Sequence, residues 1–386
     1  MAFWLLRMKS KTHTRFVAFV DKDYGAHHPF VDSVLLEILG GKVSVDCYFS
    51  RPVTPVSGGL RTGVKVYQSM PRRRGLGRIL IFFHVLRRLM SYNRSSRIIL
   101  FVRNDPLMLL ACIIYKSLLK SDAELIFQSS FPHESHSGNI FLRGASKIIF
   151  RAVFPVVDKF VAVSEIGLSR LRGIYFKNNK DDYYAVPLLS EITAPLSLQN
   201  ISRPRKFVYI GDTSPSRGLN LILEAFRSLF LSGAEFSLHI YGDAPASLRD
   251  LAQEFNGTIL LRGKVPRLEL QSDLSYYDFG LCLIPPVDKY LESSPTKLGE
   301  YMSHYVVPIV NLEISSLKEV GESEEAVLVC SSFSVSDIKE TLWSAINMHD
   351  DQLLAAKNSV YHFSQASYSY HARSERIVRF FLGDES

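Results

Sequence analysis

Cysteine and tryptophan are scarce in this sequence. Its 386 residues include only 4 cysteines and 2 tryptophans. No Cys-x-x-Cys pair and no Cys/His cluster occurs, so the sequence encodes neither a local zinc site nor a disulfide framework. So few cysteines indicate a reducing compartment. The four are Cys47, Cys112, Cys282 and Cys330.

Long hydrophobic runs are also missing. The N-terminal apolar stretch Ala2–Leu6 is too short for the core of a signal peptide. The apolar segment 97–119 is interrupted by Arg103-Asn104-Asp105-Pro106, which a lipid-facing helix does not carry at its centre. We therefore expect a cytoplasmic protein that is soluble or attached to the inner face of the membrane.

Acidic residues are absent from positions 51–100, which carry 11 basic residues. Residues 1–200 have 28 basic against 14 acidic residues, whereas residues 201–386 have 17 against 24, and the net charge of the chain is +7. Hydrophobic residues make up 47% and charged residues 22%, which is typical of a folded protein and excludes wholesale disorder. Two halves of opposite charge predict two domains with different partners.

Short apolar runs alternate along the chain with longer segments of helical periodicity. Fully apolar strands that alternate with helices predict parallel sheets covered on both faces. The expected strands are 15–20, 43–49, 64–69, 98–102, 124–128, 159–163, 183–186, 206–210, 237–241, 258–261, 279–283, 306–310 and 326–329. Helices are expected over 219–230, 246–255, 268–276 and 296–305, and again from 350 onward.

The pattern restarts after a polar stretch that ends at Pro204. We therefore expect an α/β protein with an N-terminal domain over 1–187, a linker over 188–204 and a C-terminal domain over 205–365. The last helix, within 366–386, is expected to pack back toward the N-terminal domain. Two doubly wound, Rossmann-like domains that face one another place a ligand cleft at the carboxyl ends of their strands.

The segment Glu292-Ser-Ser-Pro-Thr-Lys-Leu-Gly-Glu300 predicts a helix start with unusual charge. Ser294 is a good N-cap, and Pro295 suits the first helical position. Lys297 then lies in the first turn, where a cation opposes the helix dipole unless an anion is bound. An ordinary capped helix with surface charges is the alternative. Three other strands end at Gly211, Gly242 and Gly263, and basic residues, Arg217 and Lys264, follow the first and the third of them.

Together these segments resemble the donor-binding domain of glycosyltransferase family 4, whose members are retaining enzymes of the GT-B fold. The resemblance covers about 206–330, and Glu292 and Glu300 have the Glu-x7-Glu spacing of the family. Residues 157–164 resemble the last strand of its N-terminal domain. The segments that carry the resemblance occur in family order as YIGDTSPSRGLNLILEAF, LHIYGD, LRGKVPRLELQSDLSYYDFGLCLIPP and ESSPTKLGEYMSHYVVPIV.

The resemblance implies sugar transfer from a nucleoside diphosphate sugar, with UDP or GDP as carrier, without a metal or other cofactor. Glu300 would hydrogen-bond the ribose, and Glu292 would lie near the donor sugar. Arg217 and Lys297 would neutralise the diphosphate, whose charge grows as the bond to the sugar breaks. Many relatives have arginine directly after the first glycine, where this chain has Asp212. Further residues expected at the donor site are Gly211, Gly242, Lys264, Ser294 and Thr296.

The basic segment 71–90 combines arginines with isoleucine, leucine and phenylalanine. From Gly77 it can form a helix with apolar residues over more than half its circumference, a composition typical of helices bound to anionic lipid. A core helix with a basic edge and a nucleic-acid-binding helix are the alternatives, and the apolar interleaving disfavours the latter. Arginines expected to contact the membrane or the acceptor are Arg72, Arg73, Arg74, Arg78, Arg87, Arg88 and, in a strand-end loop, Arg103.

Relatives often place a histidine near the donor sugar, and both His133 and His136 fit that role after the strand at 124–128. Glu134 is either an acceptor base or a solvated loop carboxylate. We expect a glycosyltransferase that acts on a glycan acceptor, lipid-linked at the membrane surface, in surface polysaccharide or glycoconjugate biosynthesis. A nucleotide-sugar epimerase of the same fold and a non-catalytic partner subunit are the alternatives.

Overall fold

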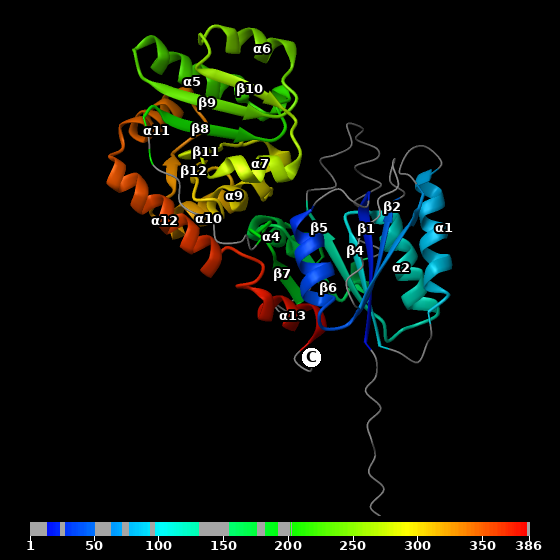
Figure 1. Cartoon of the computed structure of the whole chain (residues 1–386). Helices are drawn as coiled ribbons and strands as arrows, with labels where there is room; N and C mark the ends of the chain where they lie inside the picture. The colour runs from blue at the N-terminus through cyan, green and yellow to red at the C-terminus, as the bar shows by residue number, and fades with distance from the viewer. Residues whose placement is uncertain are drawn as a thin grey trace, which may run out of the picture. The chain divides into compact units, whose positions relative to one another are not determined.

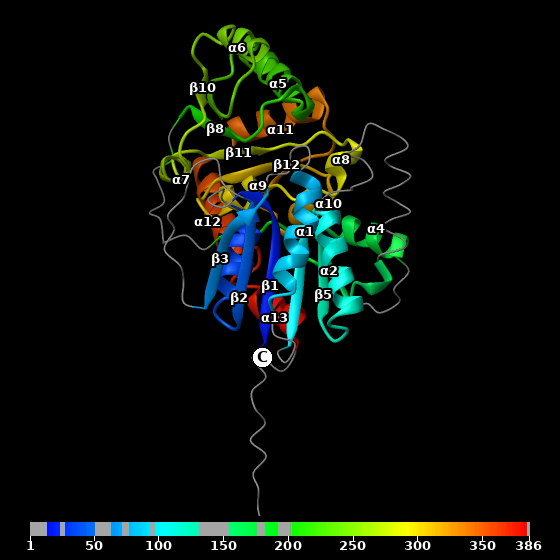
Figure 2. The same ribbon diagram turned by 90° about the vertical axis from the view of Figure 1, so that its right-hand side faces the viewer.

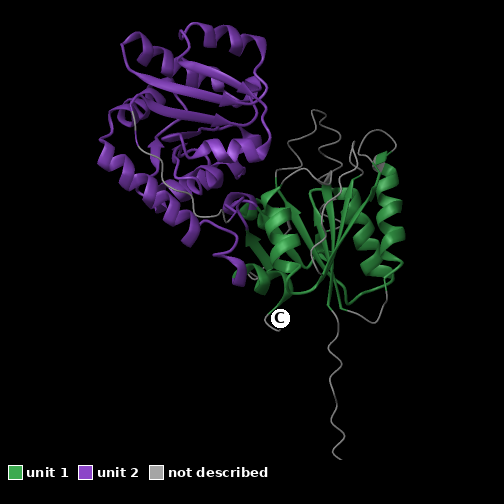
Figure 3. Cartoon of the chain, in the orientation of Figure 1, with its two compact units in different colours: residues 1–162, 168–185, 376–386 green, residues 163–167, 186–375 purple. Residues whose placement is uncertain are grey.

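The computed structural model of the chain describes residues 14–23, 28–50, 63–71, 77–92, 97–130, 154–175, 182–191, 201 and 203–383. These residues form two compact units (Figure 3). Unit 1 takes its residues from 1–162, 168–185 and 376–386, and unit 2 from 163–167 and 186–375. The chain therefore crosses between the units several times, and its last helix belongs largely to unit 1.

Unit 1 is built on a parallel sheet of seven strands in the order β3-β2-β1-β4-β5-β6-β7 (Figure 1). The strands are β1 (Arg15–Asp23), β2 (Ser44–Ser50), β3 (Val64–Met70), β4 (Ile98–Arg103), β5 (Glu124–Ser129), β6 (Lys159–Ala162) and β7 (Tyr183–Ala185). The helical elements that belong wholly or mostly to it are η1 (Phe30–Leu39), α1 (Gly77–Leu89), α2 (Pro106–Leu118), η3 (Phe154–Val156), α4 (Glu165–Tyr175) and α13 (Ser374–Leu382).

Helices cover both faces of this sheet because its side chains alternate between two apolar layers. Ile81 of α1 and Met108 of α2 join Leu100 of β4 in the core on one face. On the other face, the ring of Phe101 lies 5.9 Å from those of Phe30 in η1 and Phe381 in α13. Figure 2 shows α1 and α2 together along one side of the sheet.

Unit 2 contains a parallel sheet of six strands in the order β10-β9-β8-β11-β12-β13. The strands are β8 (Arg205–Ile210), β9 (Phe236–Tyr241), β10 (Ile259–Gly263), β11 (Phe279–Cys282), β12 (Val307–Asn311) and β13 (Leu328–Cys330). Its helical elements are η5 (Pro215–Arg217), α5 (Leu219–Leu231), α6 (Ala246–Gln253), α7 (Arg267–Leu274), α8 (Asp288–Leu291), α9 (Thr296–Met302), α10 (Ser315–Ser323), α11 (Val335–Asn347) and α12 (Asp350–Ala366). In Figure 1, α5, α6 and α11 lie on one face of this sheet, and α9, α10 and α12 on the other.

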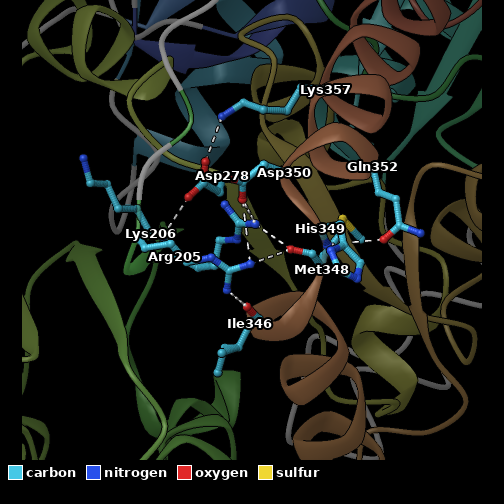
Figure 4. A network of polar contacts seen from close by, with 10 residues as sticks. Arg205, Lys206, Asp278, Ile346, Met348, His349, Asp350, Gln352 and Lys357 are labelled. Atoms are coloured by element: carbon cyan, nitrogen blue, oxygen red, sulfur yellow. Dashed lines mark hydrogen bonds and ion pairs between the residues drawn. The ribbon is translucent and has the colours of Figure 1, made fainter.

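A buried polar network joins α12 to the amino ends of β8 and β11 (Figure 4). The fully buried guanidinium of Arg205 donates to the Met348 carbonyl and pairs with Asp350 at the start of α12. The Lys357 ammonium lies 3.1 Å from an Asp278 carboxylate oxygen, and both side chains are almost completely buried. The network fixes α12 at the edge of the sheet where the strands begin.

The structure confirms the expected fold class of two α/β units with parallel sheets. Each expected strand overlaps a strand of the structure, and the helices expected from Gly77 onward and over 219–230 form as α1 and α5. Helices α8, α10 and α11 were not expected. No helix among the described residues is both long and apolar enough to span a membrane.

Candidate functional site

One cavity of unit 2 lies where β8 and β11 end. The strand order reverses between these two neighbours, because β8 leads to β9 on one side and β11 leads to β12 on the other. Ligands of doubly wound proteins bind at such a point. The cavity has a volume of about 330 Å³. It is lined by Tyr209, Ile210, Gly211, Asp212, Arg217, Leu283, Ile284, Ser293, Ser294, Pro295, Thr296, Lys297 and Glu300.

Two glycines let the loops after β8 and β9 approach one another. Gly242 has φ +156°, and a Cβ there would lie 2.2 Å from the carbonyl oxygen of Gly211. Gly211 itself has φ +131°. Side chains are excluded at both positions, at Gly242 by the contact and at Gly211 by the backbone conformation. The chain thereby brings backbone, rather than side chains, to the edge of the cavity.

Lys297 is a cation in a desolvated position. Its ammonium lies 4.0 Å from the centre of the Tyr209 ring. Across the described part of the chain, no carboxylate pairs with it. Burial, together with the nearby Arg217 guanidinium, lowers the pKa of Lys297 to about 8. An anion in the cavity would offset this desolvation and stabilise the charged form.

Arg217 is held at the cavity by two partners. Its Nε lies 3.3 Å from an Asp212 carboxylate oxygen, and its guanidinium lies 4.3 Å from the centre of the Tyr290 ring. Partial burial raises the pKa of Asp212, but hydrogen bonds from Ser214 and the charge of Arg217 outweigh it, so this pKa is lowered. Asp212 is therefore ionised and fixes the guanidinium, while its own charge weakens the positive field of the site.

Glu300 lines the cavity one turn along α9 from Lys297. The next residue, Tyr301, is fully buried, and its hydroxyl accepts a hydrogen bond from the Ile210 N–H at 3.1 Å. Gly280 of β11 leaves room for this ring, because a Cβ there would lie 2.4 Å from it. The strand end and the helix that carry the cavity's charges are thus locked together by one tyrosine.

Glu292 is buried in the loop before α9 but is not among the residues that line the cavity. Its backbone carbonyl accepts a hydrogen bond of 2.9 Å from the Ser164 hydroxyl. The loop is therefore anchored through its backbone to residues 163–167. That Glu292 contacts the donor sugar stays a prediction.

The expected cap of α9 is wrong by one residue. The helix begins at Thr296 with Pro295 as its N-cap residue. The Ser294 hydroxyl accepts a hydrogen bond from the Leu188 N–H at 2.8 Å and does not cap the helix. The Ser294 hydroxyl, which the local spacing predicts to cap the helix, therefore bonds to a residue distant in sequence. Because α9 has only seven residues, the positive charge at the cavity comes from Lys297 and Arg217 and not from a helix dipole.

A second cavity of about 410 Å³ adjoins the first and shares the end of β8 with it. Gly242, Lys264 and Val265 line it, with the Tyr241 and Leu270 side chains. Lys264 is exposed and pairs with the Asp243 carboxylate. Of the expected donor-site residues, Gly211 lines both cavities, and Gly242 and Lys264 line the second. The cations Arg217 and Lys297 line the first.

The remaining predicted residues lie elsewhere or outside the described residues. The residues that lie outside the described part of the chain are His133, His136, Glu134 and Arg72–Arg74. Arg87 is exposed and Arg88 half-buried on α1, which also carries Arg78, whereas Arg103 is buried at the end of β4. Among the described residues, no group of three or more His, Cys, Asp or Glu could hold a metal ion.

Two tyrosines of the site were missed from the sequence. Tyr209 supplies the ring under Lys297, and Tyr290 supplies the ring beside Arg217. Tyr209 sits in an apolar strand, where an aromatic residue indicates core packing. Tyr290 lies in the short helix α8, six positions before α9 begins, and no spacing rule relates it to Arg217. Only the folded geometry pairs each ring with its cation.

No protein-family model matches the sequence, and no curated protein does. Several solved structures share its architecture. A glycosyltransferase from Rickettsia africae ESF-5 matches with a TM-score of 0.70 and 11% identity over 97% of this chain and 99% of that chain. A chain from E. coli, described as trehalose-6-phosphate bound with UDP-2-fluoro glucose, matches with a TM-score of 0.68 and 11% identity over 95% and 99%.

WaaG, a glycosyltransferase involved in lipopolysaccharide biosynthesis, has a TM-score of 0.64 and 13% identity, over 96% of this chain and 100% of that chain. At such identities the likeness establishes the fold. The chain therefore has the GT-B fold, with two α/β units that each contain a parallel sheet.

Proposed function

We propose that the protein is a retaining glycosyltransferase of family 4. It transfers a sugar from a nucleoside diphosphate sugar to a hydroxyl of a glycan acceptor, without a metal. The observation that carries the proposal is the cavity at the switch point of unit 2, where Lys297, which pairs with no described carboxylate, lies with Arg217 and Glu300. The shared fold with glycosyltransferases supports the same assignment.

The cavity suits the chemistry of a diphosphate leaving group. When the bond between the sugar and the phosphate breaks, negative charge builds up on the diphosphate. A positioned cation in a desolvated site stabilises such charge more strongly than water does. Lys297 and Arg217 supply this charge, and the Glu300 carboxylate can accept hydrogen bonds from the ribose hydroxyls. The second cavity, whose lining combines apolar residues and glycines with the charged Asp243 and Lys264, has room for the nucleoside base.

Thermal-shift measurements with UDP, GDP, ADP, CMP and dTDP test the donor class. A nucleotide at 100 times its Kd should stabilise the protein by about 2.7 kcal/mol. Glu300→Ala is expected to lose most of that stabilisation, whereas Glu340→Ala, an exposed carboxylate on α11, should keep it. No shift with any of the nucleotides contradicts the proposed donor site and favours a non-catalytic partner subunit.

The affinity for the stabilising nucleotide should depend on pH. Below pH 8, Lys297 is charged with or without ligand, so affinity is constant. Above the pKa of about 8 the Lys297 amine of the free protein is neutral. Binding of an anion that favours the charged form is then accompanied by uptake of a proton by Lys297. We expect affinity to fall by up to about tenfold per pH unit above pH 8. Calorimetry at pH 8 in buffers of different ionisation enthalpy should show proton uptake, absent in Lys297→Met.

We further propose that α1 of unit 1 binds the anionic inner face of the membrane, where a lipid-linked acceptor resides. Ile81, Val85 and Leu89 of this helix are buried in the core. The other face leaves large apolar side chains more than half exposed, with Arg87 exposed among them. These exposed side chains are Ile79, Leu80, Phe83 and, just after the helix, Met90. Apolar residues beside arginines fit an anionic lipid surface.

Vesicle sedimentation tests this surface. The protein should bind vesicles with phosphatidylglycerol more tightly than neutral phosphatidylcholine vesicles. Phe83→Ser should weaken binding about tenfold, because a large apolar side chain contributes roughly 1.5–3 kcal/mol when it leaves water. Trp343→Ser, which removes a half-exposed aromatic side chain in unit 2, is the control. Equal binding by both variants contradicts the assignment to α1.

A further inference from the structure

The sheet of unit 1 ends in a cluster of buried polar side chains. Arg103 and Gln128 are register partners at the carboxyl ends of β4 and β5, and their side chains therefore emerge on the same face. Both are almost completely buried, as is Asn104, which follows β4. The strand order of unit 1 reverses between β1 and β4. The cluster therefore lies at the switch point of this sheet, the position at which such sheets bind ligands.

The charges in this cluster are already balanced. Arg103 pairs through Nη1 with the Asp21 carboxylate of β1, and its Nη2 donates to His28 Nε2 at 2.7 Å. Nε2 can accept only when His28 is neutral. The Asp21 and Arg103 side chains keep 9% and 8% of their surface exposed, so the cluster reaches solvent at this pair.

Several polar atoms in the cluster have no hydrogen-bond partner among the residues that the structure describes. They are Arg103 Nε, both polar atoms of the Gln128 amide and the Ser130 hydroxyl. A buried polar atom without a partner costs about 1–3 kcal/mol. Native proteins leave few such atoms, and each one calls for an explanation. Four of them on two adjacent strand ends indicate a polar group that binds there.

The chemistry of the unpaired atoms restricts the ligand. Because Arg103 is neutralised by Asp21 and engaged by His28, the described residues of the cluster offer no spare cation for a phosphate or carboxylate. Gln128 offers one donor group and one acceptor side by side, and the Ser130 hydroxyl can act as either. Adjacent hydroxyls of a sugar ring have the same dual character. The hydroxyls of a neutral sugar can hydrogen-bond to these atoms, whereas an anion is repelled by the Asp21 carboxylate.

We propose that Gln128, Arg103 and Ser130 form a binding subsite in unit 1 for adjacent hydroxyls of a neutral sugar ring. This inference rests on the proposed function, in which it assigns the acceptor a neutral sugar at this position. Gln128 is the specificity-determining residue, because its amide contacts two hydroxyls at once. A sugar whose phosphate or carboxylate takes the place of one of these hydroxyls is disfavoured.

Saturation-transfer NMR on the full chain with methyl glycosides of glucose, galactose and mannose tests the subsite. We expect at least one neutral glycoside to bind, and Gln128→Leu to weaken its binding at least tenfold. Gln68→Leu makes the same change at a half-buried glutamine of β3 and should leave binding unchanged. Ser130→Ala provides a second, smaller change that should weaken binding severalfold even if Gln128→Leu folds poorly.

The proposal is overturned if no neutral glycoside binds, if only phosphorylated or carboxylated sugars bind, or if Gln128→Leu and Ser130→Ala bind as well as the wild type. Nucleotide-induced thermal shifts, measured on the same samples, separate this failure from failure of the proposed function. A nucleotide shift without glycoside binding removes the sugar subsite alone. Loss of the nucleotide shift in the wild type removes the proposed function as well.

Discussion

Lys297→Met should lower kcat for sugar transfer by about 10²–10³-fold, the usual effect of removing one group that stabilises developing negative charge. The ammonium is desolvated, close to Arg217, and has no carboxylate partner among the described residues. These properties make its interaction with an anion stronger than that of a surface lysine. Methionine keeps most of the apolar stem of the side chain and removes the charged ammonium group.

The kinetic signature separates stabilisation of the leaving group from simple anchoring of the nucleotide. Charge on the diphosphate increases as the transition state forms, so the loss should appear mainly in kcat. A rise in KM with kcat unchanged contradicts the proposed role. Lys339→Met, which removes an exposed lysine from α11, should leave both constants unchanged. Unfolding curves of both variants should match the wild type.

Asp212 makes the outcome at Arg217 different from that at Lys297. Arg217→Met removes a cation whose charge Asp212 already offsets in part. We therefore expect a smaller loss of kcat than for Lys297→Met. Asp212→Asn frees the guanidinium from its ion pair but also removes its anchor. An increase in nucleotide affinity in Asp212→Asn indicates that the negative charge dominates, and a decrease indicates that positioning does.

Much of the fold follows from the sequence because it depends on local patterns. Short, mostly apolar runs of four to seven residues separated by helical segments are sufficient to place the strands and to predict parallel sheets. Lys297 and Glu300 could also be found, because they lie three residues apart on one short helix after a strand end. Charges that are close in sequence and opposed to the helix dipole leave a local signal.

Features that join distant segments left no such signal. The Leu188 N–H donates a hydrogen bond to the hydroxyl of Ser294, 106 positions away, so this hydroxyl does not form the expected helix cap. The unpaired amide of Gln128 becomes visible only when β4 and β5 are in register. Lys357 reads as a surface lysine of an amphipathic helix, yet it is buried against Asp278, 79 positions away. Such contacts depend on packing between elements, which a single sequence does not specify.

Lys357→Met should reduce the free energy of unfolding of unit 2 by about 3–5 kcal/mol, because removing one partner leaves a buried charge uncompensated. Its ammonium donates to the Tyr277 carbonyl at 2.7 Å and pairs with Asp278 at 3.1 Å. Burial lowers the pKa of Lys357, and the Asp278 charge opposes that change. Urea unfolding measures the loss, with Lys339→Met as the exposed control.

The double variant Lys357→Met, Asp278→Leu separates the cost of an orphaned charge from the contribution of the pair. Replacing a whole buried ion pair by apolar residues is often neutral or stabilising, whereas breaking it is not. Asp278 also accepts a hydrogen bond of 3.0 Å from the Lys206 N–H, which the double variant leaves unpaired. We therefore expect the double variant to recover most of the stability lost in Lys357→Met, short by about 1–3 kcal/mol for that N–H. If it is less stable than Lys357→Met, the pair itself stabilises α12 against the sheet, and the orphaned charge is not the main cost.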